Sequence, residues 1–234
     1  MSTIQAAAVR MPAAGVFIDG DLRIPERAAG LVAFAHGSGS SRFSRRNRQV
    51  AESLEAHGFA TLLLDLLTPE EEAVDVRTRE FRFDIERLGH RVVAAVDWVD
   101  THPETSGLPV CCFGASTGAA AALIAAAERP DRVQGVVSRG GRPDLAGDAL
   151  ALVRAPTLLI VGGDDEAVID LNRDAMRRMT APTRLEIVPG ATHLFEEPGT
   201  LEEVCRLAAA WCAQHLRRAG PPYLSRARFS ARGT

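Results

Sequence analysis

Short, continuous apolar runs alternate along this chain with longer segments in which apolar residues recur every three or four positions. A run such as 31–35 or 60–64 is typical of a strand that is buried on both faces of a sheet. A segment such as 84–100, with its apolar residues at helical spacing, is typical of a helix that packs by one face. The expected strands are 31–35, 60–64, 109–113, 133–137, 156–161 and 184–188, and the expected helices are 45–57, 84–100, 116–129, 145–153, 169–179 and 200–216.

Two stretches interrupt this alternation. Residues 5–11 and 15–24 predict two short strands with no helix between them, so we expect an antiparallel edge of the sheet there. Within the second stretch, the triplet Asp19-Gly20-Asp21 predicts a turn. Residues 66–83 are first acidic and then basic, without a clean period. They predict a surface excursion that is too short to form a large helical lid.

The order of the elements predicts the fold class. Strand and helix alternate from residue 31 to residue 216, which favours an α/β fold. We expect a mainly parallel, doubly wound sheet of about eight strands with helices on both faces. The length of 234 residues fits one domain, 1–217, followed by a basic and loosely held tail, 218–234. Ligands of such sheets bind beyond the carboxyl ends of the strands, so candidate residues are sought there.

Composition narrows the function classes. Hydrophobic residues make up 46% of the chain and charged residues 24%, which is ordinary for a soluble globular protein. The net charge of −3 gives no sign of a nucleic-acid or membrane partner. All 27 basic residues are arginine, which excludes a lysine nucleophile or Schiff base. The N-terminal residues show no charged region followed by an apolar signal core, and no apolar run reaches the ~18 residues of a membrane helix, so we expect a cytoplasmic protein.

The four cysteines predict packing rather than chemistry. Cys111 and Cys112 lie in an apolar run, where small buried thiols are common. Cys205 and Cys212 lie on one face of an expected helix. None of these spacings is typical of a zinc site, so we expect no bound metal.

The strongest local motif is Gly114-Ala115-Ser116-Thr117-Gly118, which lies between an expected strand and an expected helix. This strand–turn–helix setting is the one in which Gly-x-Ser-x-Gly forms a nucleophile elbow, with the serine hydroxyl exposed above the sheet. The two glycines leave room where side chains would collide. Ser116 is therefore the candidate nucleophile, and a tight turn with a polar helix cap is the alternative.

A serine nucleophile needs a base, and the base needs an acid that orients it. His193 follows the last expected strand, which gives the chain order Ser, Asp, His that is found in α/β-hydrolases. The acid is expected in the loop after strand 156–161, where Asp165 is preferred and Asp164 is the competitor. The remaining histidines are assigned no catalytic role; four lie in helices or at helix ends, namely His57, His90, His102 and His215, and His36 precedes the serine.

The oxyanion of a tetrahedral intermediate needs two preorganised donors. We expect them to be the backbone N–H groups of Thr117, at a helix N-terminus, and of Ser38, in the loop after strand 31–35. A dinucleotide-binding loop at Gly37-x-Gly39 is a weaker interpretation, because Arg42 occupies the third glycine position. Asp65, at the end of the following strand, leaves that interpretation some support.

One residue bears on the substrate. Arg139 follows strand 133–137 at the edge of the sheet where the site is expected. Arginine can bind a carboxylate or a phosphate through two parallel hydrogen bonds. Two interpretations therefore stay open: Arg139 binds an acidic group of the substrate, or it pairs with Asp144 or another acid of its own loop.

From about residue 15 to residue 217 the chain resembles the α/β-hydrolase-fold proteins of the dienelactone-hydrolase-like group. The resemblance rests on four motifs: His36-Gly37-Ser38, Gly114-Ala115-Ser116-Thr117-Gly118, residues 162–165 and His193. The first-described dienelactone hydrolases use a cysteine nucleophile, whereas this chain has a serine at that position.

Together, the motifs and the resemblance predict a serine hydrolase that cleaves a small carboxylic ester, lactone or thioester through an acyl-enzyme. This chemistry needs neither a metal nor an organic cofactor. The expected partner is a small acyl substrate, an acidic one if Arg139 binds it, and the protein is expected to be a monomer or a homodimer. Acyl transfer or peptide hydrolysis on the same triad is an alternative, and so is a non-catalytic binding protein with this fold. The substrate itself is not predicted.

Overall fold

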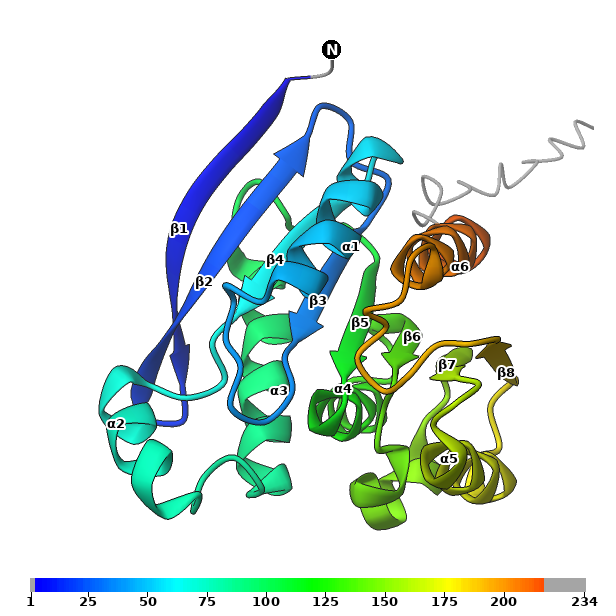
Figure 1. Ribbon diagram of the computed structural model, residues 1–234. Helices are drawn as coiled ribbons and strands as arrows, with labels where there is room; N and C mark the ends of the chain where they lie inside the picture. Colours follow the sequence, from blue (N-terminus) through cyan, green and yellow to red (C-terminus); the bar gives the residue numbers. More distant parts are fainter. Residues whose placement is uncertain (1–2, 217–234) are drawn as a thin grey trace, which may run out of the picture.

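The computed structural model describes residues 3–216, in which the strands form a single eight-stranded sheet (Figure 1). The strands are β1 (Ile4–Ala13), β2 (Val16–Pro25), β3 (Leu31–Ala35), β4 (Ala60–Leu64), β5 (Val110–Ala115), β6 (Val133–Arg139), β7 (Thr157–Gly162) and β8 (Thr183–Val188). Their order is β1-β2-β4-β3-β5-β6-β7-β8, and all pairs from β4 to β8 are parallel. The predicted fold class is therefore confirmed. The basic tail expected at residues 218–234 lies outside the described residues.

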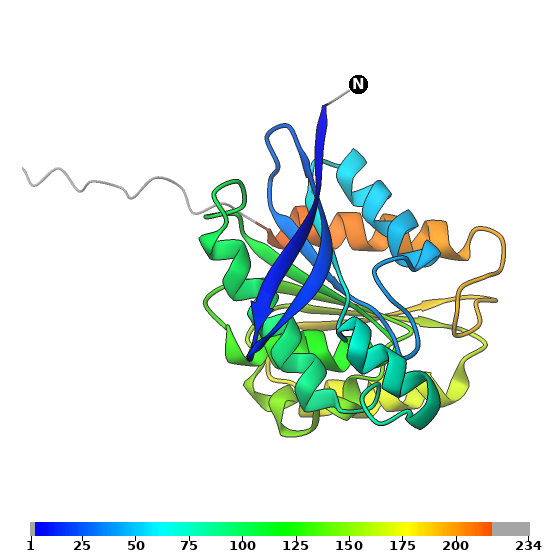
Figure 2. The same ribbon diagram turned by 90° about the vertical axis from the view of Figure 1, so that its left-hand side faces the viewer.

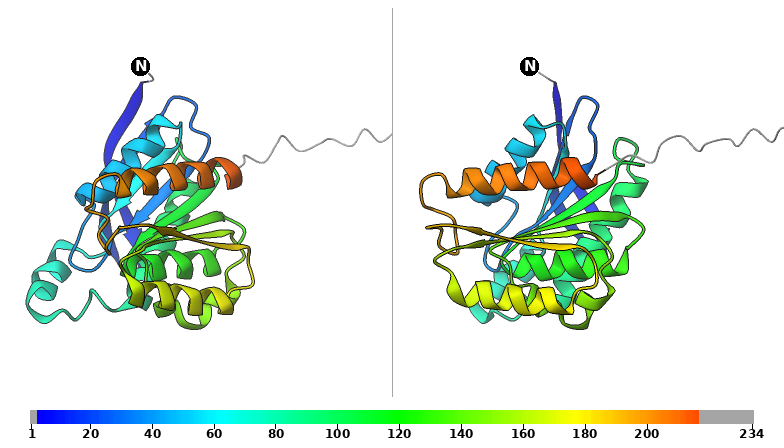
Figure 3. Two further views of the ribbon diagram at one scale, coloured as in Figure 1. Left: turned by 45° about the vertical axis from the view of Figure 1, so that its right-hand side comes forward. Right: turned by 90° about the vertical axis from the view of Figure 1, so that its right-hand side faces the viewer.

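Helices cover both faces of the sheet (Figures 2 and 3). They are α1 (Arg45–Ala56), α2 (Pro69–Thr78), α3 (Ile85–Thr101), α4 (Thr117–Glu128), the 3-10 segment η1 (Pro143–Leu152), α5 (Glu166–Arg178) and α6 (Thr200–His215). Helices α1 and α6 pack on one face, and α3, α4 and α5 on the other. Every residue of β3, β4 and β5 is buried, as the continuous apolar runs predict. None of the helices between residues 3 and 216 is long and apolar enough to cross a membrane.

The N-terminal hairpin confirms the antiparallel edge but corrects the predicted turn. Strands β1 and β2 pair antiparallel, and β2 also pairs antiparallel with β4. The chain turns at Ala14 and Gly15, both of which have positive φ, while Asp19-Gly20-Asp21 lies inside β2. Gly20 serves packing instead of a turn, because a Cβ there would lie 2.9 Å from Met11 Cε and 3.1 Å from the Leu63 carbonyl oxygen.

The excursion predicted for residues 66–83 contains a helix, α2, that its irregular pattern did not predict. The helix begins with a capping box: Thr68 Oγ1 accepts the N–H of Glu71, and the Glu71 carboxylate accepts the N–H of Thr68. Pro69 occupies its first turn. Of its residues only Asp75 is fully buried, so no apolar stripe marks the helix in the sequence.

The carboxyl ends of the parallel strands all lie at one edge of the sheet, where the chain leaves β3, β5, β7 and β8 for the following loops. Strand β6 runs two residues further than the sequence predicts, because Ser138 and Arg139 continue the pairing with β5. Arg139 is therefore the last residue of a strand, and it does not lie in the following loop. Helix α5 begins directly after Asp165, three residues earlier than expected.

Candidate active site

Ser116 lies in the sharp turn between β5 and α4, in a conformation that few side chains adopt. Its φ is +50° and its ψ is −122°, a strain of about 1–3 kcal/mol that persists only where the surroundings fix it. Its N–H donates to the carbonyl oxygen of Arg139 at 3.2 Å. A Cβ on Gly114 would collide with the first turn of α4, and one on Gly118 would collide with the carbonyl oxygen of Ala35. Both glycines of the motif are thus required by close approach of the backbone.

His193 and Asp165 lie beside Ser116 in the order that a catalytic triad requires. His193 Nε2 is 3.3 Å from Ser116 Oγ, and His193 Nδ1 is 2.7 Å from Asp165 Oδ2. A carboxylate can only accept a hydrogen bond, so Nδ1 carries the proton of the neutral ring. The lone pair of Nε2 then faces the serine hydroxyl, in position to accept its proton.

The loop that carries His193 is fastened at several points. The Glu197 carboxylate accepts hydrogen bonds from Thr192 Oγ1 at 2.6 Å and from the Thr192 N–H at 3.1 Å. The Asp164 N–H donates to the carbonyl oxygen of Ala191 at 3.0 Å, which joins this loop to the loop of Asp165. A side chain on Gly140 would meet the His193 carbonyl oxygen at 2.8 Å. The loop around His193 is therefore held by Glu197 and by the loop of Asp165, and it lies close to Gly140.

Of the two candidate acids, the structure brings only Asp165 to His193. The neighbouring Asp164 is exposed. Asp165 occupies the cap position of α5, but its carboxylate makes no capping hydrogen bond and is free to accept from His193. Four of the histidines that were assigned no catalytic role lie in helices or at helix ends, as expected: His57 follows α1, His90 lies within α3, His102 follows α3 and His215 ends α6.

Ser38 and Thr117 also lie at this site. The backbone of Gly37 packs against Ser116, since a Cβ on Gly37 would be 3.1 Å from Ser116 Cβ. The hydroxyl of Ser38, the next residue, is 2.9 Å from the hydroxyl of Thr117. Thr117 is the first residue of α4, so its N–H has no partner within the helix. The two residues expected to supply the oxyanion donors therefore lie next to each other, beside the serine.

His36 is buried behind the same loop and has a fixed tautomer. Its Nδ1 lies 2.9 Å from the carbonyl oxygen of Gly37, which can only accept, and its Nε2 accepts the N–H of Leu66 at 3.1 Å. Burial lowers the pKa of His36 below 6.5, against the opposing effects of the Gly37 hydrogen bond and the charge of Asp65. His36 is thus a neutral packing residue.

The dinucleotide interpretation of Gly37-x-Gly39 finds no support. It needs a free acid at the end of the following strand, and Asp65 is already engaged. Its Oδ1 accepts the N–H of Arg42 at 2.7 Å, and its Oδ2 pairs with the guanidinium of the same residue.

Arg139 is buried beside the triad, and the part of the chain that the structure describes gives it no carboxylate partner. The residue is 6% exposed, and among residues 3–216 no acidic oxygen lies within 4.0 Å of its guanidinium. Its Nη2 is 3.4 Å from Asn47 Oδ1, its guanidinium carbon is 6.0 Å from the centre of the Phe195 ring, and its Nε has no hydrogen-bond partner. Burial, with a smaller effect from Arg46, lowers the pKa of Arg139 to about 10. The side chain therefore remains charged near neutral pH.

The alternative expectation, that Arg139 pairs with Asp144, is wrong. Asp144 pairs with Arg142 instead, whose Nε and Nη2 donate to its carboxylate at 2.9 Å and 2.8 Å. Because Arg139 belongs to β6 and Arg142 to the loop, the two guanidinium groups have different surroundings. A buried charge with no counter-ion is costly, so Arg139 remains a candidate for binding an anion.

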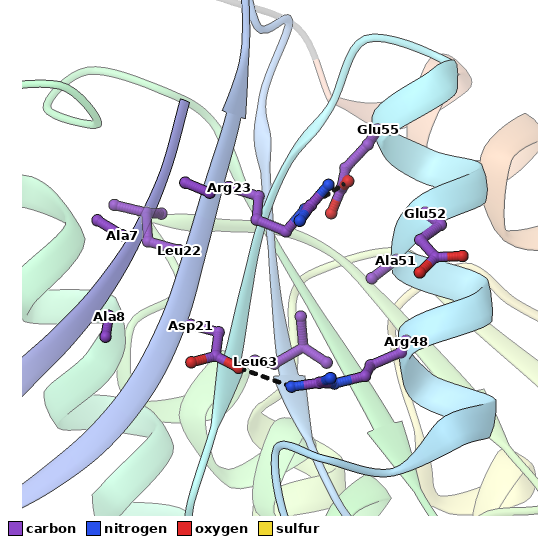
Figure 4. Close-up of a pocket in the computed structure, with 11 residues that line it drawn as sticks. Ala7, Ala8, Asp21, Leu22, Arg23, Arg48, Ala51, Glu52, Glu55 and Leu63 are labelled. Carbon is purple, nitrogen blue, oxygen red and sulfur yellow. Dashed lines mark hydrogen bonds and ion pairs between the residues drawn. The ribbon is translucent and has the colours of Figure 1, made fainter. Parts of the chain in front are cut away.

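A separate cavity of about 290 Å³ lies between the β1–β2 hairpin and α1 (Figure 4). Four of its charged side chains pair with each other: Arg23 with Glu55 at 2.8 Å and Arg48 with Asp21 at 3.0 Å. No residue of the Ser116 site lines it. Within residues 3–216, no group of three or more His, Cys, Asp or Glu side chains is placed to hold a metal ion. The Ser116 site is therefore the candidate active site.

Comparison with known proteins gives the family. The model of the dienelactone hydrolase family matches residues 18–215. The crystal structure of a dienelactone hydrolase from Anabaena variabilis is 57% identical, with a TM-score of 0.90, over 92% of this chain and 99% of that one. Est1E from Butyrivibrio proteoclasticus shares the fold, with a TM-score of 0.72 at 17% identity over 88% of this chain and 98% of that one.

Two curated proteins, from two strains of Mycobacterium tuberculosis, are each named putative phosphoribosyl transferase. Each is 57% identical over 213 residues, which is 91% of this chain but 47% of theirs. The chain thus spans about half the length of the curated relatives it matches. The family match covers most of the chain and agrees with the motifs that predicted the resemblance. The chain belongs to the dienelactone hydrolase family.

Proposed function

We propose that this protein is a serine hydrolase that cleaves a small carboxylic ester, lactone or thioester. Membership of the dienelactone hydrolase family supports hydrolysis of an ester bond. The observation that carries the finer proposal is the continuous contact from Ser116 Oγ through the His193 ring to Asp165. Such a contact chain turns a weakly nucleophilic hydroxyl into one that can attack a carbonyl carbon.

In the proposed reaction, Ser116 Oγ attacks the carbonyl carbon while its proton passes to His193 Nε2. Asp165 holds the ring through Nδ1 and stabilises the imidazolium that forms. The tetrahedral intermediate collapses as His193 delivers the proton to the leaving oxygen or sulfur, which leaves an acyl-enzyme. His193 then takes a proton from water, the hydroxide attacks the acyl carbon, and the proton returns to Ser116. The sum consumes one water and needs no cofactor.

In this proposal the backbone N–H groups of Ser38 and Thr117 donate hydrogen bonds to the carbonyl oxygen and stabilise the negative charge that develops on it. Their side chains lie 2.9 Å apart beside Ser116, and the N-terminus of α4 adds a favourable dipole. Loss of one such donor costs about 10²–10³-fold in kcat in a serine protease, so these two groups supply a large share of the proposed rate enhancement.

The test of this proposal is covalent labelling with a small fluorophosphonate, followed by intact-mass measurement. Wild-type protein is expected to gain one adduct, because Ser116 is activated, and Ser116→Ala is expected to gain none. A folded wild-type protein that takes no adduct would contradict the proposal and favour a non-catalytic binding protein. Product analysis with water and an added alcohol or amine as competing acceptors then distinguishes hydrolysis from acyl transfer, and a peptide substrate tests for peptidase activity.

The name of the curated relatives suggests a different activity, phosphoribosyl transfer. This chain covers only 47% of those proteins, whereas it covers 99% of the Anabaena dienelactone hydrolase. The half that the chain does not match can hold the activity in their name. We therefore assign ester hydrolysis to this chain.

We propose further that the acyl substrate carries an anionic group that Arg139 binds. The guanidinium is charged and buried, and within residues 3–216 it has no carboxylate partner and its Nε has no hydrogen-bond partner. Its position is close to the chemistry, because Arg139 accepts the N–H of Ser116 and its side chain lies against Phe195, two residues after His193. An anion there would relieve the cost of the unpaired charge.

Replacing Arg139 by glutamine is expected to lower kcat/KM for a carboxylate-bearing ester by about 10- to 100-fold, the value of a hydrogen bond to a charged group. The neutral methyl ester of the same acyl group is expected to change by less than about threefold. Arg142→Gln serves as the control, since Arg142 is paired with Asp144. An unchanged ratio between the acidic and neutral substrates would rule out the assignment of Arg139.

A further inference from the structure

The segment 66–82 is hydrogen-bonded to the oxyanion loop, residues 36–39, near both of its ends. At its start, the N–H of Leu66 donates to His36 Nε2 at 3.1 Å. At its end, the carbonyl oxygen of Arg82 accepts the hydroxyl of Ser38 at 3.1 Å. The Arg82 guanidinium lies against Gly39, since a Cβ on that glycine would be 3.1 Å from its Nη1. The oxyanion loop is thus held between two points of one segment.

The hydrogen bonds of Ser38 have a fixed direction. Its hydroxyl has one proton, which it donates to the Arg82 carbonyl, because a carbonyl can only accept. The hydroxyl of Thr117, 2.9 Å away, must therefore donate to Ser38 Oγ. A chain of hydrogen bonds runs from Thr117 through Ser38 to Arg82, and it joins the two residues whose N–H groups are proposed to bind the oxyanion.

Asp75 holds Arg82 in place. Its carboxylate is fully buried and accepts the N–H groups of Phe81 at 2.7 Å and of Arg82 at 2.9 Å. The same carboxylate pairs with Arg82 Nε at 2.6 Å, and Arg82 Nη2 donates to the Asp75 carbonyl oxygen at 3.0 Å. Asp75 therefore accepts hydrogen bonds from both the backbone N–H and the guanidinium of Arg82, the residue whose carbonyl oxygen accepts from Ser38. A buried carboxylate with these three donors leaves little freedom to residues 81 and 82.

The segment is in turn anchored to the body of the fold. The Glu71 carboxylate, which caps α2, also accepts from Arg87 at 2.8 Å and from Arg91 at 2.9 Å, both in α3. Arg91 itself is buried and donates to the carbonyl oxygen of Ala13 at the end of β1. Helix α2 is therefore fixed to α3 at one end and to the oxyanion loop at the other.

We propose that segment 66–82 positions the oxyanion hole and that Asp75 is its positioning residue. This inference rests on the proposed function, since it takes the N–H groups of Ser38 and Thr117 as the oxyanion donors. Asp75 touches no reacting atom. It acts through Arg82, whose carbonyl oxygen fixes the Ser38 hydroxyl and so the orientation of the loop. Oxyanion binding depends on donors held at 2.7–3.1 Å from the developing charge, so a small displacement of the loop weakens it.

The kinetic test uses Asp75→Asn, with Asp84→Asn as the matched control. Asp84 accepts one backbone N–H, that of Arg87, where Asp75 accepts two, and like Asp75 it pairs with an arginine through Nε, here Arg87 at 3.0 Å. Neither Asp84 nor Arg87 has a hydrogen bond to the oxyanion loop among the described residues. Asp75→Asn is expected to lower kcat on a short acyl ester by about 10- to 100-fold, less than the loss of a whole donor, with KM within about threefold. The affinity for an alkyl boronic acid, which forms a tetrahedral adduct on the serine, is expected to fall by the same factor. Asp84→Asn is expected to leave both quantities within about twofold.

A second measurement is independent of catalysis. Hydrogen–deuterium exchange in the peptide that covers residues 36–41 is expected to rise in Asp75→Asn and to stay unchanged in Asp84→Asn. Should Asp75→Asn fail to fold, Ser38→Ala replaces it, because it removes the hydroxyl bridge and keeps the N–H. It is expected to show the same split between kcat and KM and the same rise in exchange.

The outcomes separate this inference from the proposed function. Unchanged exchange in residues 36–41 of Asp75→Asn overturns the inference whatever the activity, and so does a loss of kcat that Asp84→Asn reproduces. If fluorophosphonate does not label the wild-type protein, the proposed function is overturned. If hydrogen–deuterium exchange still rises in Asp75→Asn, the result supports the positioning of the oxyanion loop by segment 66–82. A rise in KM with unchanged kcat and boronic acid affinity would assign Asp75 to substrate binding and reject its positioning role.

Discussion

Ser116→Ala is expected to lower kcat for a short acyl ester by about 10⁶-fold, the loss found when the nucleophile of a serine protease is removed. That factor corresponds to about 8 kcal/mol of transition-state stabilisation. The effect is large because Ser116 Oγ is the one hydroxyl that His193 Nε2 contacts among residues 3–216, so its removal leaves the base without a described side chain to activate. The residual rate above the uncatalysed reaction then measures what the oxyanion donors and substrate binding contribute by themselves.

Ser138→Ala is the matched control for this measurement. Ser138 is buried in β6, next to the strand that carries the elbow, and its Oγ has no hydrogen-bond partner among residues 3–216. Its removal is expected to change kcat by less than about threefold, since no polar partner is left behind. Thermal midpoints within about 3 °C of wild type would show that both variants keep the fold, as that shift corresponds to about 1 kcal/mol. Comparable activity of Ser116→Ala and wild type would refute the role of Ser116.

The sequence predicts those parts of the site that depend on residues close together in the chain. The elbow at Ser116 needs glycine on either side because backbone atoms approach there, and the structure places Ala35 and the first turn of α4 at those positions. The approach of His193 and Asp165 follows from a general rule, since both come after parallel strands whose carboxyl ends share one edge. The apolar runs predict where the strands end, and this is enough to predict that His193 and Asp165 lie near Ser116 without knowledge of contacts between distant segments.

The parts that the sequence does not predict depend on contacts between distant segments. Asp75 and Arg82 lie in a stretch without apolar periodicity, and only the contacts from Asp75 to Arg82 and from Arg82 to the oxyanion loop give them a role. The one local signal in that stretch was Thr68 followed three residues later by Glu71, the pattern of a capping box.

Two other differences have the same origin. Asp19-Gly20-Asp21 has the composition of a turn, but pairing with β1 and β4 on both sides keeps it inside β2. Arg139 follows a polar serine at the end of an apolar run, which resembles the start of a loop. Pairing with Ala115 of β5 extends the strand to include it and turns its side chain toward Asn47 and Phe195. In both cases the pairing of neighbouring strands overrides the local preference of the sequence.

Asp165→Asn is expected to lower kcat by about 10⁴-fold near neutral pH, the effect of the same change in a serine protease triad. The reason is the tautomer of His193. The carboxylate accepts from Nδ1 at 2.7 Å and so keeps the lone pair of Nε2 toward Ser116. An asparagine amide can instead donate to Nδ1, which places the ring proton on Nε2. A protonated Nε2 has no lone pair toward Ser116 and cannot accept the proton of the serine hydroxyl. The rate of fluorophosphonate labelling is expected to fall with kcat, because both depend on that proton transfer.

Asp164→Asn provides the control, since it removes the same charge from the same loop. The Asp164 carboxylate is exposed, and only its backbone N–H contacts the His193 loop, so kcat is expected to stay within about threefold of wild type. Neither substitution removes a helix cap, because the Asp165 carboxylate makes no capping hydrogen bond to α5. Equal losses in the two variants would point to the charge of the loop as the cause and would contradict the assignment of Asp165. A loss confined to Asp165→Asn would instead tie the activity to the one carboxylate that contacts His193.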